Sequence, residues 1–310
     1  MLHKFLQLTS GMLSSGKLTI LMYHQVVQQR DPMRPTEPDA ATFDWQMRLI
    51  RRYFTPLSLS EALERLQDNR LPNNAICVTF DDGYLNNLTV AAPILARHKV
   101  PATVYIATAF SQGENMWNDR LQDLCADQKR TILQTGQSQL QLTDWASRIH
   151  AAQQLINQLK YLPVRTRLQQ VDNLYQLNGA SEYPSRMMST TQIKELAAQG
   201  ITIGAHTHNH PILKSLTPSE QQQEISRCKS GLEQLLQCPV VHFAYPNGVE
   251  GRDFDDETMH LVAAAGFQSA VVTNRGFSTA DSNLYKLKRF APWDGSPLKF
   301  HLHLLKNYLS

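Results

Sequence analysis

The sequence TFDDG (residues 79–83) places Asp81 and Asp82 side by side at the end of the apolar run Ala75–Phe80. Adjacent carboxylates repel each other unless a cation or a proton separates their roles. In parallel α/β folds the active site forms at the carboxyl ends of the strands, where this pair would lie. The pair therefore indicates metal binding or acid–base chemistry, although an Asx turn that ends a strand would contain the same residues.

Three histidines fall within five residues in GAHTHNHP (residues 204–211), directly after a second strand-like run, Ile201–Ala205. Histidine is the commonest metal ligand in proteins. His206 and His210 could bind one cation if the chain turns just after the strand. One Asp with two His resembles a facial metal triad, which keeps positions open for water and substrate. The other carboxylate would then be free to act as a base, as metal-assisted hydrolysis requires.

Two further segments lie at the ends of strand-like runs, but their residues give a weaker indication of catalysis. FAYPNG (residues 243–248) is by itself typical of a turn, because Pro is followed by Asn-Gly. His24 follows the run LTILMY and, taken alone, is more typical of a structural residue than of a catalytic one.

The elements that must position these residues alternate along the chain. Strand-like runs rich in β-branched residues are found at 18–23, 75–80, 102–107, 201–205, 240–245 and 269–273, with helical patterns between them. Strands that alternate with helices of 10–15 residues predict βα units and a parallel sheet. The runs are almost entirely apolar, so both faces should be buried. We expect an α/β fold, a distorted (β/α) barrel of seven or eight parallel strands.

Two parts of the chain depart from this pattern. Residues 1–17 predict a separate N-terminal helical segment, whose residues 2–13 could pack on the domain or touch a membrane or a partner. The main domain is expected to span residues 18–310. Within it, residues 111–185 are polar and rich in Gln and Leu, which predicts a helical insertion. The insertion could cap the site or be a packing appendage without substrate contact.

Composition excludes several classes of protein. The chain has 310 residues, 42% hydrophobic and 18% charged, which is a globular balance. A net charge of +3 gives no case for nucleic-acid binding. No run approaches the roughly 18 apolar residues of a membrane span. Without a convincing signal peptide, and with four cysteines in no CxxC pair, we expect a cytoplasmic protein, with peripheral membrane association left open.

Together the four segments resemble the polysaccharide deacetylase family, also called carbohydrate esterase family 4 or the NodB homology domain. The order of YH, TFDDG, HTxxHP and a P-x-G turn is that of the family, and the resemblance runs from about Leu18 to Phe290. The YH near the N-terminus is similar to the branch found with exopolysaccharide synthesis and to poly-N-acetylglucosamine deacetylases.

The resemblance implies a role for each matching residue. Asp81 would be the general base, and Asp82 would bind the metal together with His206 and His210. His208 occupies a variable position of the motif and is not expected to be a ligand. The implied cofactor is one divalent ion, with Zn²⁺ expected and Co²⁺, Ni²⁺ or Fe²⁺ compatible with the same ligands.

Other matching residues would contact the acetyl group or the sugar. The backbone N–H of Asn247 would match the family's oxyanion donor, and Tyr245 and Pro246 would shape that pocket as substrate-binding residues. Asp294 in PWDG is a candidate for the rim of the site, although a turn residue there would look the same.

The chain also departs from the family pattern. Ala244 stands where the family's turn usually has an arginine that orients the base, and Arg289 is our candidate replacement, although it could be a plain surface arginine. The usual late histidine motif is missing. His301 and His303 occur near the C-terminus, but on a predicted amphipathic helix. We therefore expect His24 to be the general acid.

The expected function is a metal-dependent hydrolase that removes N-acetyl groups from amino sugars of a polysaccharide or glycan intermediate in exopolysaccharide or cell-envelope metabolism. Its expected partner is an N-acetylated glycan, which the sequence does not identify. One alternative is a catalytically impaired carbohydrate-binding relative, which the missing arginine favours. Another is a different C–N hydrolase on the same fold.

Overall fold

The computed structural model describes residues 2–292 and 294–309; Met1, Trp293 and Ser310, which fall within the predicted ranges, lie outside the described residues. The strands are β1 (Thr19–Tyr23), β2 (Thr55–Pro56), β3 (Ala75–Phe80), β4 (Ala102–Ile106), β5 (Ile132–Gln134), β6 (Gln139–Gln141), β7 (Thr202–Ala205), β8 (His242–Ala244), β9 (Ser269–Arg275) and β10 (Leu287–Arg289). The α-helices are α1 (Leu2–Leu13), α2 (Ala40–Tyr53), α3 (Leu59–Gln67), α4 (Ala92–His98), α5 (Trp117–Ala126), α6 (Trp145–Leu159), α7 (Val164–Leu177), α8 (Thr190–Ala198), α9 (Pro218–Leu236), α10 (Asp256–Ala264) and α11 (Pro297–Asn307). Short π- or 3₁₀-helical segments are η1 (Asn87–Ala91), η2 (Thr108–Gln112), η3 (Leu213–Ser215) and η4 (Leu284–Lys286).

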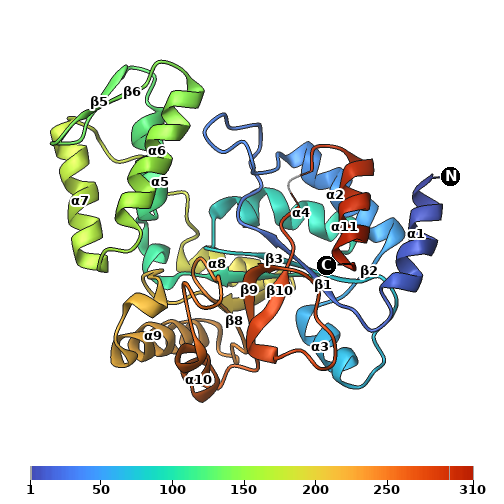
Figure 1. Cartoon of the computed structure of the whole chain (residues 1–310). Helices are drawn as coiled ribbons and strands as arrows, with labels where there is room; N and C mark the ends of the chain where they lie inside the picture. The colour runs from blue at the N-terminus through green and yellow to red at the C-terminus, as the bar shows by residue number, and fades with distance from the viewer. Residues whose placement is uncertain (1, 293, 310) are drawn as a thin grey trace.

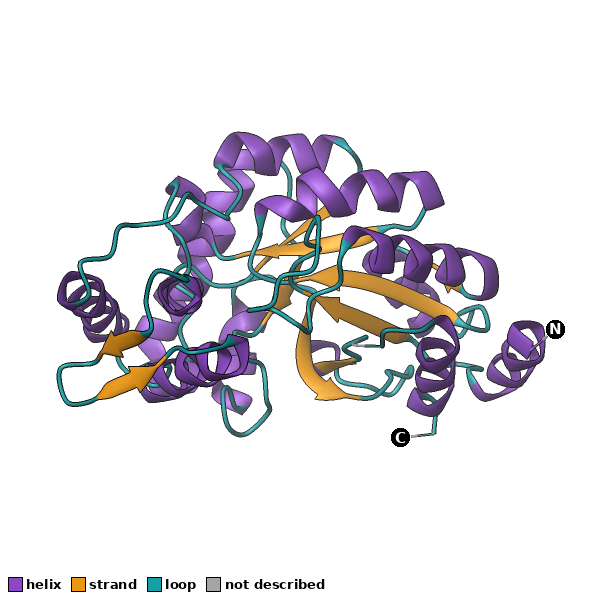
Figure 2. Cartoon of the chain, turned by 90° about the horizontal axis from the view of Figure 1, so that it is seen from above, coloured by secondary structure: helices purple, strands orange, loops and turns teal. Residues whose placement is uncertain are grey.

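The main sheet is a nearly closed parallel barrel, as predicted. Its strands follow the order β1-β3-β4-β7-β8-β9-β10, and β2 pairs with β3 outside this path. The end of β10 returns to β1, where the Met22 N–H donates to the Phe290 carbonyl (3.0 Å) and the Phe290 N–H donates to Ile20 (2.8 Å). Figure 2 shows the strands enclosed by the helices. Among the described residues, seven parallel strands form the barrel.

Alternating side chains give the barrel an apolar interior and an apolar outer face. On β3, all six residues are buried; Cys77 belongs to the inner cluster, and Ile76 and Val78 belong to the cluster beneath the helices. This follows from the two-residue period of a strand. Inside the barrel, a Cβ atom on Gly204 would lie 2.4 Å from Cδ1 of Tyr105, so glycine is required for this ring to fit.

Most of the helices that cover the barrel begin at residues with capping side chains. Thr217 and Glu220 form a capping box at the start of α9, and Pro218 occupies the first turn. A Pro at this position loses no hydrogen bond, because the first N–H groups of a helix have no partner within it. α9 buries Ile225, Cys228 and Leu232 against the barrel.

The insertion between β4 and β7 forms its own core. α5, α6 and α7 pack together around buried residues such as Leu121, Leu155 and Val171. Figure 1 shows this unit beside the barrel, with the segment between β1 and α2 reaching toward it. The insertion was predicted to be helical, and it also contains a short antiparallel hairpin formed by β5 and β6. Its alternating polar pattern, with only Leu133 buried, gave no clear strand signal.

The two ends of the chain lie together on the side of the barrel away from the insertion (Figure 1). α1 packs against α11 and α2, and the ring of His3 stacks on that of His301 with centroids 5.3 Å apart. None of the helices among the described residues has the length and apolar character needed to cross a membrane.

Candidate active site

Three side chains from two strand tips form a compact group of metal-ligand type. One ligand atom from each of Asp82, His206 and His210 lies within 4.8 Å of the others. Oδ1 of Asp82 lies 3.4 Å from Nε2 of both histidines. Nδ1 of His206 lies 2.7 Å from the Ala244 carbonyl oxygen, which can only accept a hydrogen bond. Nδ1 therefore carries the proton, and the lone pair of Nε2 points toward the group.

The backbone at this site adopts conformations that ordinary residues avoid. Asp82 has φ 77°, Thr207 has φ 63°, His210 has φ 50° and Asn247 has φ 58°. Left-handed conformations are most unusual for β-branched residues such as Thr207. Such strained conformations cluster at functional sites, where the surrounding structure stabilises them. Here they turn the chain so that residues following the strands face the barrel axis.

Asp81 is held by an arginine from the last strand of the barrel. Its two carboxylate oxygens accept hydrogen bonds of 2.7 Å each from Nη1 and Nη2 of Arg289. Both side chains are buried, and Nε of Arg289 donates to the Val272 carbonyl at 3.0 Å. Ala244 lies on the inner face of the barrel, within the same interior cluster as Tyr105. The predicted replacement arginine thus lies directly against Asp81.

The protonation states follow from burial and neighbouring charges. Burial raises the pKa of Asp81, but the Arg289 guanidinium outweighs it and holds that pKa below its usual range. Burial likewise opposes ionisation of Asp82, yet the neighbouring imidazoles of His206 and His210 hold its pKa well below normal. Burial lowers the pKa of His210 to about 3. An ionised carboxylate beside a neutral imidazole is the state that a divalent cation requires of its ligands.

These observations fit a divalent cation. Asp82, His206 and His210 supply one carboxylate and two imidazoles, which is a donor set typical of Zn²⁺ and of the late first-row transition metals. Asp81 is occupied by Arg289 and remains outside the donor group. His208 also lies outside this group, and its Nδ1 lies 2.9 Å from Oγ1 of Thr108.

A cavity of about 350 Å³ opens over this group. The strand-tip residues that line it are His24, Asp81, Asp82, His206, His210, Asn247 and Thr273. Its remaining wall comes from the segment after β1, from the turn after β3 and from α5, and consists of Gln25, Arg34, Glu37, Tyr84, Asn118, Asp119 and Gln122. The sequence analysis identified none of the residues in this second set, because loop and insertion residues carry no motif.

His24 and Asn247 both face this cavity. Burial alone would lower the pKa of His24, but the carboxylates of Asp82, Asp81 and Glu37 together raise it. Nδ2 of Asn87 donates to the His24 carbonyl at 2.9 Å, which holds the backbone at this point. Within the described residues, the N–H of Asn247 has no hydrogen-bond acceptor. The geometry therefore leaves one imidazole and one backbone donor available to a ligand.

The structure does not bring Tyr245 or Pro246 to the cavity wall. The ring of Tyr245 stacks on Phe254 with centroids 4.0 Å apart, and its hydroxyl donates to the Tyr285 carbonyl at 3.0 Å. Alternation along the strand explains this, because Ala244 points into the barrel and its neighbour therefore points outward. Direct substrate contact by Tyr245 thus has no support, and the residue instead anchors the turn that carries Asn247.

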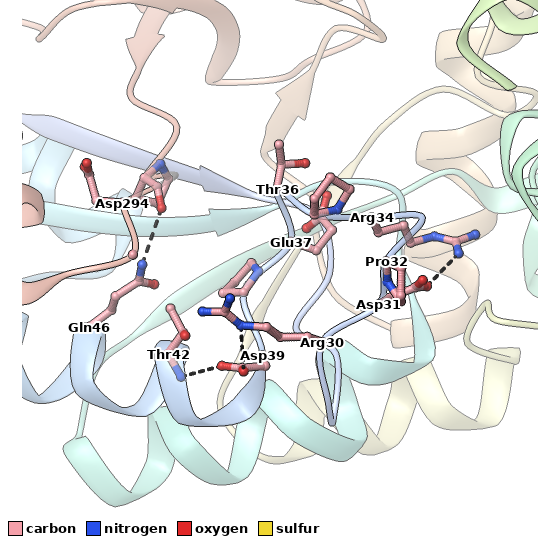
Figure 3. Close-up of a pocket in the computed structure, with 14 residues that line it drawn as sticks. Arg30, Asp31, Pro32, Arg34, Thr36, Glu37, Asp39, Thr42, Gln46 and Asp294 are labelled. Atoms are coloured by element: carbon pink, nitrogen blue, oxygen red, sulfur yellow. Dashed lines mark hydrogen bonds and ion pairs between the residues drawn. The ribbon is translucent and has the colours of Figure 1, made fainter. Parts of the chain in front are cut away.

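Asp294 lies in a second pocket of about 430 Å³, which shares Arg34 and Glu37 with the catalytic cavity (Figure 3). Its Oδ2 lies 2.8 Å from Nδ1 of His303 on α11. His301 is buried beneath α1 and contacts Tyr53. Neither C-terminal histidine lines the catalytic cavity.

Comparison with known proteins identifies the family. A family model described as polysaccharide deacetylase matches residues 68–270, more than half of the chain. The chain belongs to the polysaccharide deacetylase family, whose membership implies a hydrolase that removes N-acetyl groups from glycans.

Individual relatives are distant in sequence and similar in fold. YxkH of Bacillus subtilis (strain 168), which carries a provisional polysaccharide deacetylase name, is 23% identical over 274 residues, covering 88% of this chain and 71% of that protein. The Streptococcus pyogenes deacetylase PplD, solved in complex with acetate, superposes with a TM-score of 0.64 at 21% identity, covering 93% and 98% of the two chains. A de-N-acetylase from Aggregatibacter actinomycetemcomitans gives 0.58 at 14% identity, covering 94% and 99%.

Proposed function

We propose that this protein is a metal-dependent hydrolase that removes the N-acetyl group from amino sugars of a glycan in exopolysaccharide or cell-envelope metabolism. The observation that carries the proposal is the pairing of two neighbouring carboxylates with different partners. Asp82 faces His206 and His210, and Asp81 is held by Arg289 beside them. Metal-assisted hydrolysis of an amide can use such a pair, with one carboxylate as a metal ligand and the other as the base.

A divalent cation bound by Asp82, His206 and His210 would polarise the acetyl carbonyl and lower the pKa of a nearby water from 15.7 to about 7. Asp81 would accept the proton of the attacking water. Arg289 keeps this carboxylate ionised and fixes its orientation through two hydrogen bonds. General acid–base catalysis of this kind typically contributes about 10²–10⁴-fold to the rate.

The remaining two groups would act on the acetamide itself. The Asn247 N–H would donate to the carbonyl oxygen as negative charge develops there, and one such donor is typically worth about 10²–10³-fold in kcat. His24 would donate a proton to the sugar nitrogen as the C–N bond breaks. The elements of water are divided between the products, which are acetate and a free amino sugar.

The relatives support an N-acetyl substrate. PplD is described as a deacetylase bound to acetate, and the Aggregatibacter protein as a de-N-acetylase. Within the polysaccharide deacetylase family, the presence of His24, Asp81, Asp82, His206 and His210 in one cavity argues for catalysis rather than for binding alone.

The test is release of acetate from a panel of N-acetylated oligosaccharides, including β-1,4- and β-1,6-linked N-acetylglucosamine pentamers. We expect release that stops on chelation and returns when Zn²⁺, Co²⁺, Ni²⁺ or Fe²⁺ is added. If the protein binds a pentamer but releases no acetate with any of the metals, the carbohydrate-binding alternative replaces this proposal.

A cytoplasmic location stays a prediction. It is supported by the four cysteines, none of which forms a disulfide within the described residues. Cell fractionation followed by immunodetection tests it, and recovery of the protein in an extracytoplasmic fraction would contradict it.

A further inference from the structure

Two amide side chains of the insertion face the catalytic cavity without a hydrogen-bond partner among the described residues. Asn118 and Gln122 lie four residues apart on α5, which places them on one face of the helix. Both line the cavity that contains Asp81, Asp82 and the two ligand-type histidines. The insertion therefore supplies part of the wall of the active site.

The carbonyl oxygens of these amides are shielded from solvent and unpaired. Oδ1 of Asn118 and Oε1 of Gln122 have no hydrogen-bond partner within the described residues. A buried polar atom without a partner destabilises the folded state. Because the oxygen and nitrogen of an amide can exchange places by a turn of its plane, either atom of each side chain can face a ligand in the cavity.

The acidic residues of the same helix are fully used by the protein. Asp119 accepts hydrogen bonds from Tyr84 (2.8 Å) and Arg34 (2.9 Å). Asp123 accepts from Arg34 at 3.2 Å and from Arg186 at 2.7 Å. These contacts bind α5 to the segment after β1 and to the turn that carries the catalytic carboxylates. They hold the helix in place while leaving its two amides unengaged.

We propose that Asn118 and Gln122 form a sugar-recognition pair that hydrogen-bonds ring hydroxyls of the amino sugar whose acetamide is cleaved. This inference rests on the proposed function. An amide offers a donor and an acceptor side by side, which matches the O–H groups of a sugar ring. The cavity of about 350 Å³ has room for a small ligand. The pair would make the insertion a determinant of glycan specificity.

Isosteric apolar variants test the pair. In Asn118→Leu and Gln122→Met, kcat/KM for an N-acetylglucosamine pentamer should fall about 3- to 10-fold each, as expected for losing a hydrogen bond. Hydrolysis of 4-nitrophenyl acetate, which carries the acetyl group without a sugar, provides the reference. We expect the ratio of pentamer to ester kcat/KM to fall in both variants. The melting temperature should not fall, because an unpaired amide is replaced by an apolar group of similar shape.

Gln158→Met is the matched control. Gln158 is an exposed amide on α6 of the same insertion and lies outside the catalytic cavity. Its substitution should leave both activities and their ratio unchanged. If the pentamer-to-ester ratio is also unchanged in Asn118→Leu and Gln122→Met, the recognition pair is refuted. A fall in melting temperature with a parallel loss of both activities would show a structural role instead.

Binding measurements separate this inference from the proposed function. Titration calorimetry of the pentamer into wild type and into both variants measures its binding affinity separately from the rate of acetate release. Weaker binding by the variants, with no acetate released by wild type, would overturn the proposed function and retain the pair. Acetate release with equal binding by all proteins would retain the function and overturn the pair. If wild type neither binds nor hydrolyses β-1,4- or β-1,6-linked pentamers, both are overturned.

Discussion

Asp81 and Asp82 follow one another in the chain, yet their side chains have different partners. Asp81 is paired with Arg289 inside the barrel, and Asp82 faces His206 and His210. The left-handed backbone at Asp82, with φ 77°, separates them. The neighbouring Gly83 has little room for a side chain, because its Cβ would lie 2.9 Å from Cδ1 of Ile106. The backbone conformation therefore places these two aspartates in different environments, one against Arg289 and the other against the two histidines.

The identity of the general acid is testable at this scale. His24→Ala should lower kcat for glycan deacetylation by about 10²–10⁴-fold. Apart from the two ligand histidines, His24 is the only histidine that lines the cavity among the described residues. His303→Ala is the control, since His303 contacts Asp294 in the adjoining pocket. Steady-state acetate release measures both. A large loss in His303→Ala with little loss in His24→Ala would move the acid to the C-terminal segment.

Arg289 should set the pH at which the base becomes active. The guanidinium lowers the pKa of Asp81, so its removal in Arg289→Gln should raise that pKa. A base must be deprotonated to act, and a higher pKa leaves less of it ionised at acidic pH. The acid limb of kcat/KM should therefore shift to higher pH.

The pH–rate profile of folded Arg289→Gln measures this shift. Lys288→Gln is the matched control, because Lys288 is the exposed neighbour on β10. Identical acid limbs in wild type and Arg289→Gln would contradict the assignment of Asp81 as the base that Arg289 orients.

At the scale of elements, a strand can be predicted from the sequence when all of its residues are buried and therefore apolar. The prediction fails when buried and exposed residues are mixed. β3 was predicted with its observed bounds because all six residues are buried. β10 was missed because its middle residue, Lys288, is exposed and the strand has only three residues. The tips of β3 and β7 were correctly predicted to meet, since parallel strands place their carboxyl ends at one edge. The outward direction of Tyr245 follows from strand alternation only once Ala244 is known to face the barrel interior, which the sequence does not show.

The contact between the insertion and the barrel depends on a buried ion-pair network. Arg34 is 5% exposed and pairs with Asp119 and Asp123. Removing the cation leaves two buried carboxylates with fewer partners, so Arg34→Met should lower the free energy of unfolding by about 3–5 kcal/mol. Urea denaturation measures this change.

Arg30→Met is the matched control for this prediction. The Arg30 side chain is 81% exposed and lies 3.6 Å from Asp39. An exposed pair of this kind is worth less than about 1 kcal/mol. Equal effects of the two substitutions would show that the buried network does not hold the insertion against the barrel.

At the scale of the whole molecule, the barrel could be predicted and the cavity could not. Alternating strands and helices predict a parallel α/β barrel from the sequence alone. The cavity wall, by contrast, combines Glu37 from the segment after β1 with Asn118 from the insertion. Nothing in their local sequence indicates that these residues meet. Their approach depends on long-range contacts such as the Arg34–Asp119 pair, which joins residues 85 positions apart.

The most direct test of the central claim compares Asp81→Asn with Asp82→Asn, measuring bound metal per chain and acetate release in the same preparations. The account predicts that Asp81→Asn retains one equivalent of metal and loses almost all turnover, since only the base is changed. Asp82→Asn should lose both, because it removes the carboxylate of the ligand group. If Asp81→Asn loses its metal, or if it remains active, the division of roles between the two carboxylates is wrong.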